Sequence, residues 1–205
     1  MTITLLDYGS GNIRSVAKAL EAASGQPVRV TATPKDVAEA ARLVVPGQGA
    51  FGQCRAAITG VPGLVEALYQ AVWHRRVPYL GICVGMQLML DRGLEDGVHP
   101  GFGWISGTVE RLNLDDPALK IPHMGWNTLR VRQDHNLLED LDGKHVYFCH
   151  SFAARSVTAP LATTDYGGDQ VASIGRDNMI GVQFHPEKSQ GVGLSLLAAF
   201  ARWSP

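Results

Sequence analysis

The chain is poor in charged residues, in cysteine and in long hydrophobic runs. Charged residues make up 18% of its 205 residues, and the formal net charge is -1. So weak a net charge creates no field that would draw the whole chain to nucleic acid or to an anionic membrane. The mixture of basic and aromatic residues typical of RNA and DNA readers does not occur either. Nucleic-acid and membrane-surface functions are therefore poor candidates.

The cysteines are too few and too widely spaced for a disulfide framework. They are Cys54, Cys83 and Cys149, and neither C-x-x-C nor H-E-x-x-H, two common metal-binding patterns, occurs. The apolar stretch after Met1 ends at Asp7 and lacks the basic start of a signal peptide. No apolar run reaches the length of a membrane span. We therefore expect a cytoplasmic protein that binds no metal.

The first half of the sequence alternates strand-like and helix-like segments. We expect strands at 2–8, 28–33, 42–45 and 77–82, and helices at 13–24, 34–41 and 62–75. Such alternation predicts an α/β fold, with an open, mostly parallel, twisted sheet covered by helices on both faces.

The second half is mainly β-like, with glycine and asparagine turns. Its segments predict an antiparallel extension of the sheet and a closing helix at 192–203; the strands are expected at 107–112, 127–132, 144–150, 170–175 and 179–184. No repeat or linker interrupts the chain, and its length suits one unit. A single domain spanning residues 1–205 is the expected organisation.

Cys83 lies between two glycines where a predicted strand meets a predicted helix. The pattern Gly81-x-Cys83-x-Gly85 is a cysteine version of the nucleophile elbow, a sharp turn that projects a reactive side chain. The backbone N–H of Val84, which follows, could then stabilise an oxyanion. The alternative is a buried cysteine packed in a tight turn.

A thiolate nucleophile needs a base and a group that orients the base. His185 ends a strand-like run, and Pro186 favours an extended conformation for it. Side chains two apart in an extended chain point the same way, which places the Glu187 carboxylate beside the imidazole. The alternative is an ordinary surface His–Glu pair. His150 is a rival base at another strand end, but it has no carboxylate nearby in sequence.

Two glycine-containing turns complete the candidates. The turn Gly47-Gln48-Gly49 follows a strand and could direct backbone N–H groups at an anion, although many such turns are only turns. The pair Gly9-x-Gly11 suggests a dinucleotide site, but Arg14 stands where the third glycine of that fingerprint should be. We therefore expect an oxyanion site at the first turn and no nucleotide cofactor.

Taken in order, the P-G-x-G turn, G-x-C-x-G-x-Q and H-P-E resemble the class I (triad-type) glutamine amidotransferases. Three further stretches are similar to the glutaminase subunits of imidazole glycerol phosphate synthases, which act in histidine biosynthesis: 7–12, 122–127 and 147–152. The segment 185–190 fits the same subunits. The resemblance covers essentially the whole chain and implies a flavodoxin-like sheet of the class I amidotransferase type.

The resemblance implies a role for each matching residue. Cys83 would attack the side-chain amide of glutamine, His185 would move the proton, and Glu187 would orient His185. The remaining assignments are the oxyanion hole at Val84, Gly47, Gln48 and Gly49; the substrate contacts Gln87, His150, Ser151 and Phe152; and the partner interface Asn12, Trp126 and Lys188. Trp126 could instead be ordinary packing. Relatives commonly have tyrosine where Phe152 stands, which would remove one hydroxyl contact.

The resemblance also implies a partner, and it leaves two alternatives open. The partner would be a cyclase subunit with a (β/α)8 barrel, joined in a heterodimer, which uses the ammonia to form imidazole glycerol phosphate and an aminoimidazole carboxamide ribotide. The first alternative is a binding module that keeps the fold without catalysis. The second is the same glutaminase chemistry serving another synthase, such as one for anthranilate or guanylate.

Overall fold

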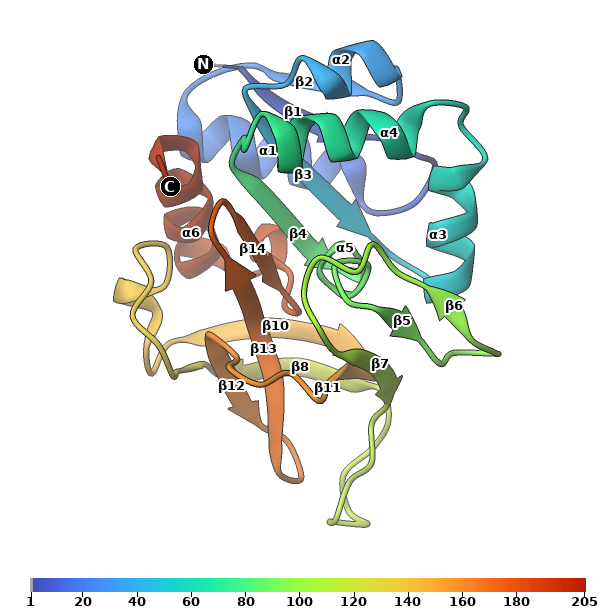
Figure 1. The fold of residues 1–205 in the computed structure, drawn as a ribbon. Coiled ribbons are helices and arrows are strands. Elements are labelled where there is room, and N and C mark those ends of the chain that lie inside the picture. Colours follow the sequence, from blue (N-terminus) through green and yellow to red (C-terminus); the bar gives the residue numbers. More distant parts are fainter. Residues whose placement is uncertain (1) are drawn as a thin grey trace.

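A computed structural model describes residues 2–205, which form one large sheet, two small sheets and flanking helices (Figure 1). The first five strands of the large sheet run parallel in the spatial order β2 (Val28–Thr31), β1 (Ile3–Leu6), β3 (Arg42–Gly47), β4 (Tyr79–Cys83) and β14 (Met179–Val182). Strands β1, β3, β4 and β14 are buried along their whole length. Continuous apolar runs of this kind suit parallel strands that are covered on both faces.

The sheet continues with three antiparallel strands: β13 (Asp169–Arg176), β12 (Ala162–Asp165) and β9 (Arg130–Val131). The expected parallel sheet with an antiparallel extension is thus confirmed. Two of the segments expected in that extension, 107–112 and 144–150, instead form strands of the small sheets. The segment expected at 127–132 is divided, since its start belongs to a strand of a small sheet and only Arg130–Val131 joins the large one.

The small sheets lie beside the carboxyl ends of the parallel strands (Figure 1). One pairs β8 (His123–Thr128) with β10 (His145–His150). The other has the order β11 (Phe152–Arg155), β7 (Thr108–Arg111), β5 (Arg92–Gly93) and β6 (His99–Pro100). Strand β10 alternates buried and more exposed residues, so it buries one face only and packs as a separate layer.

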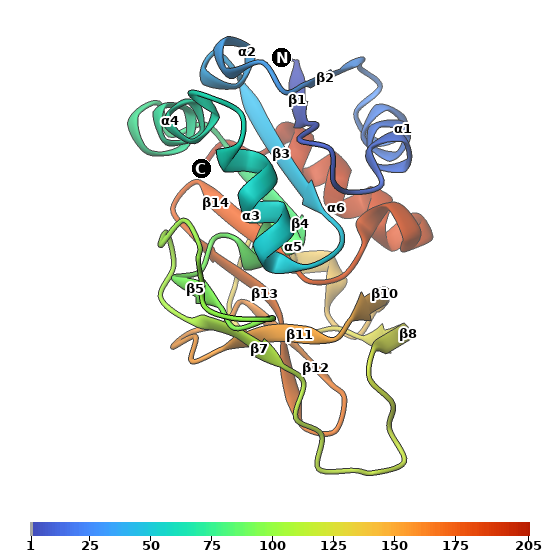
Figure 2. The same ribbon diagram turned by 90° about the vertical axis from the view of Figure 1, so that its right-hand side faces the viewer.

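Helices cover both faces of the large sheet (Figure 2). On one side α1 (Ile13–Ser24) packs against α6 (Gln190–Arg202). On the other side α4 (Leu64–Tyr69) contacts both α2 (Pro34–Ala38) and α3 (Phe51–Thr59). Helix α1 ends where expected, because Gly25 takes a left-handed conformation and its N–H caps the carbonyl of Glu21.

Helix α3 was not expected from the sequence, and the helix expected at 62–75 is divided. Its second half, Gln70–His74, is a π-helical turn that continues α4. A single turn, α5 (Val84–Gln87), follows β4, and short 3₁₀ turns lie at Glu139–Leu141 and Pro186–Lys188. Across residues 2–205, no helix combines the length and the apolar character needed to cross a bilayer.

Candidate active site

Cys83 is the last residue of β4, and the chain turns sharply at it. Its φ of 54° and ψ of -112° are unusual for a residue with a Cβ, and such strain is often found at functional sites. Helix α5 begins at the next residue, so the N–H of Val84 has no partner within the helix. Helix α5 is only one turn long and so has little helix dipole. A negative charge at this turn would therefore be stabilised by the Val84 N–H itself.

The glycines beside Cys83 are required by close packing, because the positive φ at this turn belongs to the cysteine itself. A Cβ on Gly85 would lie 1.8 Å from the carbonyl oxygen of Val45 on β3. One on Gly81 would lie 2.5 Å from the carbonyl oxygen of Gly85. The elbow therefore sits directly against the neighbouring strand, which fixes the position of the thiol.

His185 and Glu187 lie together, as the H-P-E spacing predicts. The Nδ1 of His185 is 2.9 Å from Oε1 of Glu187, and both side chains are buried. The Cys83 side chain lies close enough to the imidazole to act on its pKa. Since Nδ1 faces the carboxylate, Nε2 is the nitrogen left to face the sulfur. The structure thus brings together the three residues that the motifs predicted as nucleophile, base and orienting group.

The electrostatics of this group favour a charged imidazole. Burial by itself lowers the pKa of His185, but the hydrogen bonds to Cys83 and Glu187, together with their negative charges, raise it to about 10. A protonated His185 beside the sulfur stabilises the thiolate, which is the nucleophilic form of cysteine. The remaining oxygen of Glu187, Oε2, is buried and receives no hydrogen bond within residues 2–205.

Gln183 is a residue of this site that the sequence reasoning missed. Its side chain is fully buried, and Nε2 lies 3.6 Å from the Cys83 sulfur. Its Oε1 accepts a hydrogen bond of 3.0 Å from Nε2 of Gln87, which also donates to the carbonyl oxygen of Phe152 at 3.0 Å. The pattern Gln183-Phe184-His185, directly after β14, could have suggested it, because residues two apart in an extended segment share a face.

The predicted oxyanion turn lies beside the elbow. Gly47 pairs with Cys83 across β3 and β4, and a Cβ there would lie 2.7 Å from the Val84 side chain. The N–H of Gln48 donates a hydrogen bond of 3.3 Å to Oγ of Ser10, and the Ser10 hydroxyl in turn donates to the Gln48 carbonyl. In this conformation the backbone N–H of Gln48 is already used in its hydrogen bond to Ser10. Gly49 has a φ of 104°, a conformation that glycine accommodates freely.

A cavity of about 260 Å³ opens above Cys83. It brings together most of the predicted oxyanion and substrate residues, namely Gln48, Gly49, Cys83, Val84, Gln87, His150, Ser151 and Phe152. Glu95 also lines it, and its Oε2 accepts a hydrogen bond of 2.8 Å from the N–H of Phe51. Glu95 is a second residue that the sequence reasoning did not identify.

The sequence model for glutamine amidotransferase class-I matches residues 4–202. The chain belongs to the class-I glutamine amidotransferase family. The imidazole glycerol phosphate synthase subunit HisH of Rhodospirillum rubrum is 52% identical over 214 residues, and that of Agrobacterium fabrum is 50% identical over 216, with each chain fully covered. A solved structure described as a glutamine amidotransferase aligns with a TM-score of 0.74 at 19% identity, covering 97% of this chain and 98% of the other.

In this glutamine amidotransferase the rival base His150 is engaged elsewhere. Its Nδ1 lies 3.0 Å from the Phe152 carbonyl oxygen, and its Nε2 lies 3.2 Å from Nδ1 of His123. Burial is the main cause that lowers the pKa of His150 to about 3, and the neighbouring His123 lowers it further. His150 is therefore a neutral ring with both nitrogens committed, whereas His185 faces the sulfur.

The predicted interface residues lie near the site but outside its cavity. Trp126 on β8 is 47% exposed, and its ring contacts Tyr147 on β10 with 6.0 Å between centroids. The ammonium of Lys188 lies 5.7 Å from the centre of the same Tyr147 ring. Trp126 and Lys188 thus share one surface, which we call the Trp126 face. Asn12 precedes the first residue of α1, a helix that contacts the Pro186–Lys188 turn.

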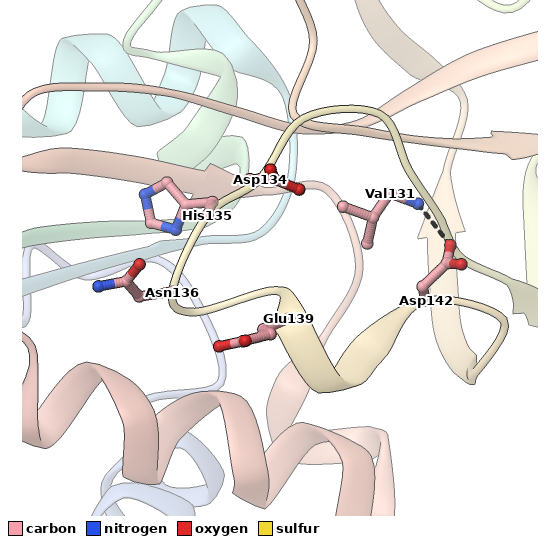
Figure 3. A pocket seen from close by; sticks show the side chains of 6 residues that line it. All are labelled: Val131, Asp134, His135, Asn136, Glu139 and Asp142. Carbon is pink, nitrogen blue, oxygen red and sulfur yellow. Dashed lines mark hydrogen bonds between the residues drawn. The ribbon is translucent and has the colours of Figure 1, made fainter.

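A second cavity, of about 430 Å³, is separate from this site (Figure 3). Its lining is polar and partly acidic: Val131, Asp134, His135, Asn136, Glu139 and Asp142. One carboxylate oxygen of Asp142 already accepts a hydrogen bond of 2.9 Å from the N–H of Val131. In the part of the chain that the structure describes, no three acidic, histidine or cysteine side chains are grouped so as to hold a metal ion.

Proposed function

We propose that this glutamine amidotransferase is the glutaminase subunit of an imidazole glycerol phosphate synthase. In this role it hydrolyses L-glutamine to glutamate and ammonia at Cys83 and passes the ammonia to a cyclase subunit. The observation that carries the proposal is the group of Cys83, His185 and Glu187, in which Cys83 lines a cavity, His185 lies beside it and Glu187 holds the imidazole. The similarity to HisH subunits over the full length of both chains supports the choice of synthase.

The chemistry follows from the positions of these groups. The Cys83 thiolate adds to the carboxamide carbon of glutamine, and protonated His185 gives its proton to the departing nitrogen, which leaves as ammonia. The γ-glutamyl thioester that remains is attacked by water, and His185 now takes the proton from that water. Glutamate leaves and the thiolate is restored, so His185 acts first as acid and then as base.

The substrate groups have matching partners in the cavity. The Oε1 of Gln87 receives no hydrogen bond within residues 2–205, although both N–H bonds of Nε2 are used. It is therefore available to accept one from the substrate. The Glu95 carboxylate offers a counter-charge to the substrate's ammonium group. His150, Ser151 and Phe152 complete the substrate contacts that we propose.

The oxyanion turn that we propose is incomplete as it stands, so we expect a partner to regulate the activity. The N–H of Val84 is available, but that of Gln48 donates to Ser10. We expect the turn formed by Gly47, Gln48 and Gly49 to rotate before a second N–H can stabilise the tetrahedral intermediate. The isolated chain should therefore hydrolyse glutamine slowly.

The partner that we propose is a cyclase subunit with a (β/α)8 barrel, which forms a heterodimer with this chain. Ammonia released into water would be protonated and lost, so a sheltered path to a docked synthase is needed. The Trp126 face offers apolar surface for docking, since Met124 is 60% exposed and Trp126 is 47% exposed. The thiols of Cys54, Cys83 and Cys149 are free, as the reducing cytoplasm would keep them.

The test measures glutamine hydrolysis with and without the barrel subunit and the ligand that this subunit binds. We expect slow turnover alone, strong activation in the complex, and loss of activity in Cys83→Ala and His185→Asn. A glutamine-mimicking electrophile should label Cys83 in the wild type. Unlabelled Cys83 would favour a non-catalytic module, and full turnover without the partner would refute the coupling.

A further inference from the structure

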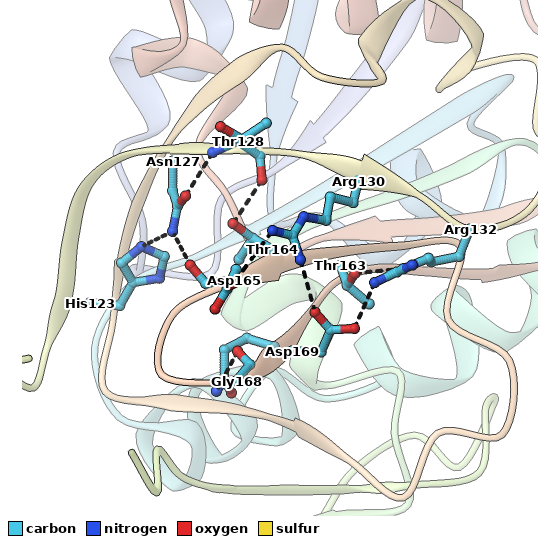
Figure 4. Close-up of polar contacts among 11 residues, drawn as sticks. His123, Asn127, Thr128, Arg130, Arg132, Thr163, Thr164, Asp165, Gly168 and Asp169 are labelled. Carbon is cyan, nitrogen blue, oxygen red and sulfur yellow. Dashed lines mark hydrogen bonds and ion pairs between the residues drawn. The ribbon is translucent and has the colours of Figure 1, made fainter. Parts of the chain in front are cut away.

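A series of hydrogen bonds runs from Asn127 on β8 to the substrate cavity, and Figure 4 shows its end at Asn127 and His123. It begins at Asn127, whose Nδ2 lies 3.3 Å from Nε2 of His123. The Nδ1 of His123 lies 3.2 Å from Nε2 of His150, and Nδ1 of His150 lies 3.0 Å from the Phe152 carbonyl oxygen. The same carbonyl accepts from Gln87, so the series ends in the cavity.

The Phe152 carbonyl, at one end of this series of hydrogen bonds, decides which nitrogen donates and which accepts in each of the others. A carbonyl oxygen only accepts, so Nδ1 of His150 carries the proton and donates to Phe152. Because His150 is neutral, its Nε2 is an acceptor, and His123 must donate from Nδ1. Burial lowers the pKa of His123 to about 4, so this ring is neutral too, and its Nε2 accepts from Asn127. Only one arrangement of protons satisfies every contact.

The surroundings of His123 hold its ring in one orientation. It is 2% exposed and is stacked between Tyr166, at 3.9 Å between centroids, and Phe148, at 4.7 Å. His123 and His150 also face each other across the paired strands β8 and β10. Asn127 is fixed from outside, since its Nδ2 also donates to the Asp165 carbonyl at 2.7 Å (Figure 4). The series of hydrogen bonds therefore ends at a backbone carbonyl on each side, that of Asp165 and that of Phe152.

We propose that His123 is a positioning residue for glutamine binding, which fixes the His150-Ser151-Phe152 segment through its hydrogen bond to His150. The inference rests on the proposed function of that segment as a substrate contact. His123 does not line the cavity or touch Cys83, so it acts through His150 and the Phe152 peptide.

The experiment measures saturation of Cys83 labelling by a diazoketone analogue of glutamine, using the full chain. His123→Phe keeps an aromatic ring for the stack but deletes the donor. We expect the half-saturating concentration to rise roughly tenfold, in line with losing one buried hydrogen bond, while the rate at saturation changes little. Alkylation by iodoacetamide, which needs no glutamine pocket, should stay as in the wild type.

The isosteric pair His123→Asn and His123→Leu separates hydrogen bonding from packing. Asn places Nδ2 where Nδ1 was and keeps a donor for His150, so it should bind the analogue more tightly than Leu does. Loss of packing alone predicts no such advantage. This pair also decides the matter if His123→Phe fails to fold. Tyr166→Phe is the control, because it keeps the stacked ring and removes only the hydroxyl bond to Lys120.

A direct signature accompanies the kinetics. In the wild type, the ¹⁵N resonances of His150 should show a neutral ring protonated at Nδ1, and the Nε2 resonance should shift in His123→Phe but not in Tyr166→Phe. Unchanged half-saturation in His123→Phe, or equal weakening in Asn and Leu, would overturn the inference. Failure of the wild type to be labelled at Cys83 would instead overturn the proposed function.

Discussion

The buried amide of Gln183 lies against the reactive sulfur, with its Nε2 3.6 Å from Sγ of Cys83. A hydrogen bond to sulfur favours the thiolate over the thiol. The same side chain accepts from Gln87, so one residue connects the proposed nucleophile with a proposed substrate contact. A change at Gln183 should therefore affect both the reactivity of Cys83 and the position of Gln87 in the cavity.

Replacing Gln183 with leucine should slow alkylation of Cys83 by iodoacetamide about three- to tenfold, since it removes a hydrogen bond to the sulfur. It also leaves a donor of Gln87 unpaired, which costs roughly 1–3 kcal/mol of stability. Gln170→Leu is the matched control, because Gln170 is also buried and donates to the Tyr166 carbonyl. It should lose stability and leave alkylation unchanged. Equal alkylation rates in both variants would contradict the assignment.

The charge on His185 should appear in the pH dependence of stability. Its pKa is raised from 6.5 to about 10 in the folded chain, so protonation stabilises the fold. This contribution is complete below pH 6.5 and is lost as the pH rises through about 10. The free energy of unfolding of the wild type, relative to His185→Asn, should therefore fall across that window. Urea unfolding at several pH values measures it, and a difference that rises with pH would refute the charged state.

Glu187→Gln tests the cause of the same shift. It removes the carboxylate charge beside Nδ1, so the NMR titration midpoint of His185 should move below its wild-type value of about 10. His135 is an internal control, because burial lowers its pKa and it lies away from Cys83. An unchanged midpoint for His185 would show that Glu187 does not set its protonation.

The sequence allowed accurate prediction where the signal was local. The βαβ alternation follows from apolar runs, and the closeness of His185 and Glu187 follows from their spacing across Pro186. Both depend on residues that are near one another in the chain. The strands at 107–112 and 144–150 were assigned to the wrong sheet, because alternation reveals a one-sided strand but not its neighbours. Helix α3 was missed because glycine and alanine obscure its apolar spacing.

The contacts that sequence reasoning missed join distant segments. Gln183 meets Gln87 across 96 positions, and His123 meets His150 across 27. Nothing in the sequence pairs His123 with His150 until β8 and β10 are known to be adjacent, or Gln183 with Gln87 until β14 and β4 are. The reason for the glycines at the elbow was also inaccessible, because the obstacle to a side chain at Gly85 is the carbonyl of Val45 on another strand.

Two glycines of α6 provide a matched test of how the His185 turn is held. A Cβ on Gly193 would lie 1.9 Å from the carbonyl oxygen of Pro186, whereas nothing lies within 4 Å of one on Gly191. Gly193→Ala should therefore displace the turn, cost roughly 1–3 kcal/mol and lower glutaminase activity. Gly191→Ala should be neutral or stabilise by up to about 1 kcal/mol. Thermal unfolding and turnover in the complex measure both. Similar behaviour of the two variants would show that contact with Pro186 is unimportant.

Ser10 provides a test of the oxyanion turn. Its hydroxyl holds both the N–H and the carbonyl of Gln48, and so opposes rotation of that peptide. Ser10→Ala should raise the slow hydrolysis of glutamine by the isolated chain about three- to tenfold, because one or two exposed hydrogen bonds no longer hold the resting turn. Activity in the complex should change less, since we propose that the partner already shifts the turn. Ser195→Ala, which removes an exposed hydroxyl far away on α6 that bonds the Gly191 carbonyl, is the control. A fall in basal hydrolysis with Ser10→Ala would show that Ser10 supports the active turn instead of opposing it.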